Sequence, residues 1–96
     1  MTHLYAIKDC ATGYIKIGYS VDPRARMNDL QVGCAGRLEL IHAERVADSS
    51  ARLLESGLHR ELNHYRVRGE WFSCDESFVR SAMIHHIIRW GNGLDE

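Results

Sequence analysis

Two short segments with alternating side chains, joined by only four residues, constrain the fold of this chain most. They read HLYAIKD (3–9) and YIKIGYS (14–20), and the turn CATG (10–13) between them ends in glycine. So short a connection returns the second segment antiparallel to the first, which predicts a β-hairpin. Because side chains alternate along a strand, Ile15 and Ile17 share one face, and Lys16 lies on the other with Tyr14 and Gly18.

The rest of the chain predicts three helices, one further strand and one irregular segment. Asp22 is a suitable N-cap and Pro23 fits the first helical position, so a helix is expected to run to about Val32 and to end at Gly33. After it we expect a strand at 37–46, a helix at about 49–65, an irregular segment at 67–75, and a helix at about 75–90 that ends at Gly91-Asn92-Gly93.

This element order predicts a small α+β fold. We expect a three-stranded antiparallel sheet with packed helices, in the order β-β-α-β-α-α. With 96 residues the chain supports one modest core, so 1–96 is interpreted as a single domain. Its motif-bearing part spans about 3–73, and the C-terminal helix follows.

Composition and cysteine usage indicate an intracellular protein with no membrane partner. Hydrophobic residues make up 45% and charged residues 26%, which are ordinary values for a globular domain. No apolar run approaches the roughly 18 residues of a membrane span, and the N-terminus does not resemble a signal peptide. Cys10, Cys34 and Cys74 are odd in number and lack C-x-x-C spacing, so we interpret them as reduced thiols.

The formal net charge of -1 argues against strong electrostatic binding of nucleic acid by the whole surface. Any phosphate contact must therefore come from local clusters of arginine. The sequence offers Arg24 with Arg26, and a second group of Arg60, Arg66 and Arg68. The alternative is that these arginines only solvate the surface.

The helix at 49–65 places three chemically active side chains beside its buried stripe. At about 100° per residue the stripe is formed by Ala51, Leu54, Leu58, Leu62 and Tyr65. Glu55 lies at its edge, His59 is one turn further on, and Arg66 projects to the same flank. This grouping predicts either a site or a boundary ion pair with a capping histidine.

Five elements of the sequence, taken in order, resemble the GIY-YIG nuclease superfamily. Tyr5 in LYAI precedes the triplet KIG at Lys16 by eleven positions, and Arg26 follows Gly18 by eight. Glu55 stands in the pattern E-x-x-L-H, and LHRELNHYRVRGEWF ends in G-E-W-F. The resemblance is to the phage and bacterial branch, which carries lysine in the second triplet. It covers residues 3 to about 73.

The resemblance implies a metal-dependent endonuclease that hydrolyses DNA phosphodiester bonds in a bacterial or phage-infected cell. Glu55 would hold one Mg²⁺, with Mn²⁺ as a substitute, and Arg26 would neutralise the scissile phosphate. A phenol is a weak base unless a cation stabilises its phenolate. We therefore expect Tyr5 to activate water with help from Lys16, while His59 is the alternative base. Substrate contacts are assigned to Arg24, Arg66 and Arg68.

The chain also departs from the pattern of the superfamily. His3 and Leu4 replace glycine and isoleucine in the first triplet, Lys16 replaces tyrosine in the second, and Asn63 and Asn92 are poor matches to the usual asparagine. Glu70 and Trp71 are expected to close the domain rather than to bind metal.

Two other functions stay open at this point. One is a non-catalytic nucleic-acid or protein-binding module on the same scaffold, and the other is a regulatory protein that uses 60–68 as an interface. Neither the preference for single-stranded or duplex DNA nor the need for a homodimer or protein partner follows from the sequence.

Overall fold

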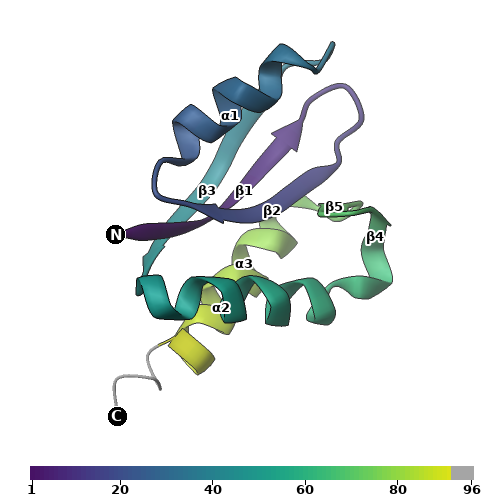
Figure 1. Cartoon of the computed structure of the whole chain (residues 1–96). Helices are drawn as coiled ribbons and strands as arrows, with labels where there is room; N and C mark the ends of the chain where they lie inside the picture. Colours follow the sequence, from purple (N-terminus) through teal and green to yellow (C-terminus); the bar gives the residue numbers. More distant parts are fainter. Residues whose placement is uncertain (92–96) are drawn as a thin grey trace.

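The computed structural model describes residues 1–91 and shows a five-stranded antiparallel sheet with three α-helices (Figure 1). The strands are arranged in the order β3-β1-β2-β5-β4. The α+β class and the antiparallel pairing are confirmed. The elements are β1 (Thr2–Asp9), β2 (Ile15–Ser20), α1 (Pro23–Val32), β3 (Leu38–Val46), α2 (Asp48–Glu61), a 3-10 turn η1 (Asn63–Tyr65), β4 (Arg66–Arg68), β5 (Trp71–Phe72), α3 (Glu76–His86) and a π-helical turn η2 (Ile87–Gly91).

The N-terminal hairpin forms as predicted, and its register places the residues of interest on one face. Gly13 has a positive φ of 81°, a conformation that glycine adopts without a steric penalty, and its N–H donates to the Asp9 carbonyl. Tyr5 pairs with Gly18, and Ile7 pairs with Lys16. Directly paired residues point to the same side of a sheet, so Tyr5, Lys16 and Gly18 share a face.

The predicted three-stranded sheet is wrong in strand number, because the segment expected to be irregular forms a second hairpin. β4 and β5 turn at Gly69, which has a positive φ of 53°, and β5 pairs with β2 at Ile15 and Lys16. These strands have three and two residues. So short a strand shows no measurable alternation, and it is extended only because β2 offers a free edge.

The helix predicted at 49–65 is α-helical only as far as Glu61. The Leu62 N–H still bonds to the Leu58 carbonyl, but the chain then tightens into η1, and Tyr65 leaves the buried stripe with 41% of its surface exposed. The last helix begins as expected at the N-cap Asp75, whose carboxylate accepts from the Ser77 N–H, and it passes into η2 after His86. Of the predicted stop signal, Asn92 and Gly93 lie outside the described residues.

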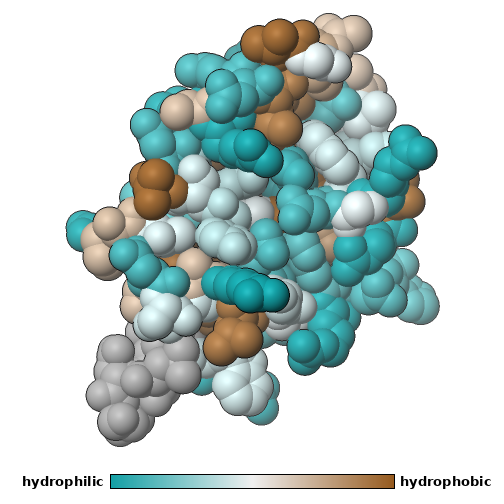
Figure 2. Space-filling view, viewed as in Figure 1, coloured by the Kyte–Doolittle hydropathy of each residue, from teal (hydrophilic) through white to brown (hydrophobic). Residues whose placement is uncertain are grey.

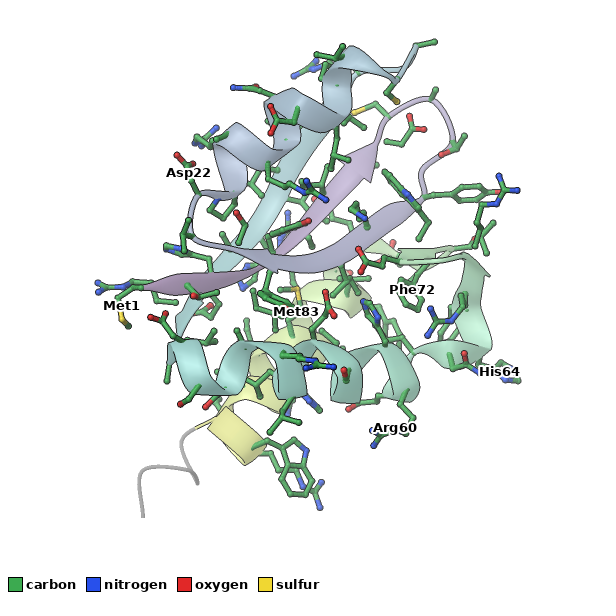
Figure 3. All side chains as sticks on the ribbon, in the orientation of Figure 1. Met1, Asp22, Arg60, His64, Phe72 and Met83 are labelled. Atoms are coloured by element: carbon green, nitrogen blue, oxygen red, sulfur yellow. The ribbon has the colours of Figure 1, made fainter. Side chains whose placement is uncertain are left out.

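Helices cover both faces of the sheet, so two cores flank it. On one face, Tyr5, Ile7 and Leu38 pack beneath α1. On the other, apolar side chains of the sheet meet those of α2 and α3, with Phe72 and Met83 between the layers (Figure 3). Ile15 and Ile17 are fully buried in this second core, as their alternation predicts. The remaining members are Leu4, Ala6, Val46, Ala51, Leu54, Leu58, Leu62 and Val79.

Two smaller predictions concern the membrane and the cysteines. Within residues 1–91, no helix combines the length and the apolar character needed to cross a membrane. Cys10, Cys34 and Cys74 are all free thiols.

Candidate active site

A polar pocket lies along the edge of β2, past the point where β5 stops pairing with that strand. Strand β5 pairs with β2 only at Ile15 and Lys16, and the last contact along this edge is the Ile17 N–H donating to the Glu70 carbonyl at 3.1 Å. Beyond it, a pocket of about 420 Å³ lies at the strand edge. The residues that line it are Tyr5, Gly18, Tyr19, Ser20, Arg26, Glu55 and Glu70.

We place the candidate site in this polar pocket and not in a larger cavity of about 490 Å³ between α2 and the C-terminal helices. The larger cavity is lined mainly by apolar groups such as Leu53, Leu54 and Trp90. The polar pocket instead gathers two carboxylates, a guanidinium and a phenol. The molecular face in Figure 2 is predominantly hydrophilic between α1 and α2, which suits a charged substrate.

Tyr5 reaches the pocket by crossing directly over Gly18. Only 2% of Tyr5 is exposed, and a Cβ added at Gly18 would lie 2.6 Å from its hydroxyl oxygen. The glycine of the KIG triplet is therefore required for the close approach of the ring. Burial raises the pKa of Tyr5 above its ordinary value, the adjacent Arg26 guanidinium lowers it, and the carboxylates of Glu70 and Glu55 raise it further.

Replacement of Gly18 by alanine is expected to displace this ring. The added methyl group overlaps the phenol, so we expect a loss of stability of about 1–3 kcal/mol, typical of overpacking, as well as a loss of any Tyr5-dependent activity on the order of tenfold to a hundredfold. Thermal unfolding and DNA cleavage measure the two effects. An alanine variant with wild-type melting temperature and activity would show that the ring does not need this position.

Glu55 enters the pocket from α2, at the edge of the apolar stripe that the sequence predicts. Burial raises the pKa of its carboxyl, Glu70 raises it further by charge repulsion, and His59 and Lys16 lower it. Two carboxylates that repel each other in a partly buried pocket favour the arrival of a cation.

Lys16 contacts Glu70 and not Tyr5. Its Nζ lies 2.6 Å from Glu70 Oε1 and 5.8 Å from the centre of the Trp71 ring, with 8% of the residue exposed. Lys16 is not among the charges that shift the Tyr5 pKa, whereas it does lower that of Glu55. Arg26, and not Lys16, is therefore the cation that acts on the Tyr5 hydroxyl in this structure, and the expected Tyr5–Lys16 partnership stays a prediction.

His59 uses one ring nitrogen to hold β2. Its Nε2 lies 2.8 Å from the Ile17 carbonyl oxygen, which can only accept, so Nε2 is assigned the proton. Its ring also packs 5.2 Å from that of Phe72. His59 is not in the lining of the pocket. Its contacts are those of a positioning residue, and a role as base would fall to Nδ1.

The three predicted substrate arginines have different surroundings. All three nitrogens of the Arg66 guanidinium donate, to the Asn63 side chain and to the carbonyls of Gly69 and His59. Arg66 therefore stabilises the η1–β4 loop. Arg24 is exposed on α1 outside the pocket lining, and Arg68 lines a separate pocket beside Trp71.

Glu70, Tyr19 and Ser20 are site residues that the sequence did not reveal. Glu70 was expected only to close the domain, which it also does through its backbone carbonyl. A signal for its carboxylate was present: a lysine between two core isoleucines needs an anionic partner when it is buried. Tyr19, expected to pack, is 41% exposed in the pocket lining, and Ser20 had no sequence signal.

The donor set suits a hard divalent cation held by few protein ligands. Within residues 1–91, no three His, Cys, Asp or Glu side chains are grouped so that they could hold a metal. Mg²⁺ commonly binds through one or two carboxylates and keeps several waters, which leaves room for substrate phosphate. Glu55, with Glu70 nearby, fits that pattern. The pocket lining contains no thiol and no imidazole, which are the ligands that a softer metal prefers.

Comparison with known proteins gave one match. The family model described as T5orf172 domain matches residues 2–90. No curated protein and no solved structure matches the chain. The match does not name the GIY-YIG superfamily, so that resemblance stays a prediction.

Proposed function

The chain belongs to the T5orf172 domain family, whose description states no activity, and from the geometry of its site we propose that it is a metal-dependent DNA endonuclease. The observation that carries the proposal is the convergence of Tyr5, Arg26 and Glu55 on one polar pocket at the edge of β2. These residues come from a strand and two helices on opposite faces of the sheet.

Each side chain has a chemical role that its surroundings support. Glu55 would hold Mg²⁺, which would supply Lewis acidity to the scissile phosphate. Arg26 donates charge-assisted hydrogen bonds to the phosphate oxygens and lies beside the Tyr5 hydroxyl. Tyr5, in its phenolate form, would act as general base and take the proton of the attacking water. Lys16 offsets the charge of Glu70 and so keeps Glu55 more readily ionised.

We place this activity in the cytoplasm of a bacterial or phage-infected cell, on DNA, with Mn²⁺ able to replace Mg²⁺. The competing function is a binding module without catalysis. Two observations favour it: the net charge of -1, and the raised pKa of Tyr5, which keeps the phenol protonated at neutral pH. A homodimer or a protein partner could complete the grip on DNA in either case.

Metal-dependent cleavage separates the two functions. Supercoiled plasmid, single-stranded circles and a branched duplex are incubated with the protein in Mg²⁺, in Mn²⁺ and in EDTA. We expect nicks or linear products in both metals and none in EDTA. Binding of the same DNA without any product at high protein concentration would instead establish the binding module.

A further inference from the structure

A second, aromatic pocket lies beside the candidate active site. Its volume is about 290 Å³, and it lies where β5 and β4 extend the sheet past β2. Tyr14 and Trp71 are both partly exposed there, and Arg68 is exposed at the same pocket. The lining is completed by Asp9 and Val67. Nothing in the proposed chemistry uses these residues.

The aromatic pocket lies on the face of the sheet from which Tyr5 enters the active site. Trp71 pairs with Lys16 on one side and with Arg68 on the other, so all three point to the face that carries Tyr5. Lys16 joins the two pockets, because its Nζ bonds to Glu70 and approaches the Trp71 ring. Gly18 is two residues from Lys16 along β2, which is a separation of roughly 7 Å.

The chemistry of this lining suits a planar, uncharged group. Indole, phenol and guanidinium each offer a flat face on which a nucleobase stacks. Within residues 1–91, Arg68 forms no salt bridge, so its guanidinium is not committed to a carboxylate. Asp9 at the same pocket repels a phosphate; its Oδ1 accepts from the Ala11 N–H at 2.9 Å, and its Oδ2 can accept a hydrogen bond from the edge of a base.

We propose that the aromatic pocket formed by Tyr14, Arg68 and Trp71 binds an unpaired nucleobase of the DNA strand whose phosphate lies at Arg26. Tyr14 of the aromatic pocket and Gly18 of the active site are four residues apart, a separation of roughly 13 Å in extended chain, which places this base about two nucleotides from the scissile phosphate. The protein therefore acts on single-stranded or unpaired DNA in preference to intact duplex. This inference deepens the proposed function and rests on it for the position of the phosphate.

Binding without cleavage tests the pocket directly. In a Trp90→Phe background, Trp71 is the only tryptophan, and its fluorescence is titrated in EDTA and low salt with a thymidine octamer. The same titration uses an octamer with abasic sugars, an octamer duplex and a uridine octamer. We expect quenching by the thymidine octamer, with binding at least about tenfold weaker for the duplex and for the abasic strand.

Tyr14→Ala should weaken binding of the thymidine octamer between about fivefold and a hundredfold, the range for loss of one stacking partner. Tyr14 lies outside both buried clusters, so this variant is expected to fold. Tyr65→Ala removes a more exposed tyrosine that packs on Phe78 outside the pocket lining, and it serves as the control with unchanged binding.

Equal binding of the thymidine and abasic octamers, or no effect of Tyr14→Ala, would overturn the base pocket even if the protein cleaves DNA. Tighter Tyr14-dependent binding of the uridine octamer would overturn its assignment to DNA. Base-dependent binding by a protein that cleaves nothing in Mg²⁺ would instead uphold the pocket and reject the endonuclease.

Discussion

Glu55→Gln is expected to reduce DNA cleavage at least about a hundredfold while the protein stays folded, because it removes a key electrostatic group at the reacting phosphate. Glutamine keeps the volume and helix propensity of glutamate but loses the charge that attracts a hard cation. Cleavage of plasmid in Mg²⁺ gives the rate, and binding of Mn²⁺ by titration calorimetry gives the separate loss of metal. Metal binding that equals wild type would remove Glu55 from the site.

Because the pKa of Glu55 is raised, Glu55→Gln should also change the pH dependence of thermal stability. A carboxyl whose folded pKa exceeds its unfolded value binds its proton more tightly in the folded state. Its favourable contribution is present at pH below the unfolded pKa and is lost as the pH rises through the folded pKa. Without metal, Glu55→Gln should therefore melt slightly higher than wild type at neutral pH.

Glu39→Gln is the matched control for Glu55→Gln. Glu39 is a half-exposed strand glutamate that is paired with Arg37 at 3.6 Å and is not part of the pocket lining. We expect neither cleavage nor metal affinity to change. A loss of cleavage equal to that of Glu55→Gln would make the effect one of overall charge.

Tyr5→Phe and Arg26→Gln are expected each to cost about a hundredfold or more in cleavage, and their losses should not add. The Arg26 guanidinium lowers the Tyr5 pKa, so removing either partner disables the same proton transfer. Since burial raises this pKa above its ordinary value, the cleavage rate should climb with pH into the alkaline range. Arg26→Gln removes a positive charge beside Tyr5, so the rising limb of the plot of cleavage rate against pH should move to still higher pH.

Lys16→Met is expected to behave differently from Arg26→Gln. Lys16 pairs with Glu70 and lowers the pKa of Glu55, so its loss should raise the Glu55 pKa and leave the rising limb that belongs to Tyr5 in place. Its effect should then add to that of Tyr5→Phe. If the rising limb of the pH–rate profile moves as far in Lys16→Met as in Arg26→Gln, Lys16 does stabilise the Tyr5 phenolate.

Local patterns predicted most elements, and the family resemblance singled out Tyr5, Arg26 and Glu55, three of the seven residues that line the pocket. Alternation and a short turn specified the first hairpin, and the hairpin register places Tyr5 and Gly18 opposite each other. Periodicity placed Glu55 at the edge of a buried stripe, where the pocket needs it. The Asp22 cap also formed as predicted, with its carboxylate accepting from the Ala25 N–H.

The sequence by itself determined those features that a few neighbouring residues decide. They are the first hairpin, the starts of the helices and the face that each side chain occupies. Only the tertiary structure decided that 66–72 adds two strands, that Lys16 pairs with Glu70, and that Arg66 is committed to its own loop. The reason is physical. These contacts join residues distant in the chain or depend on a free strand edge, and burial, which no local pattern measures, selects the partner of each charge.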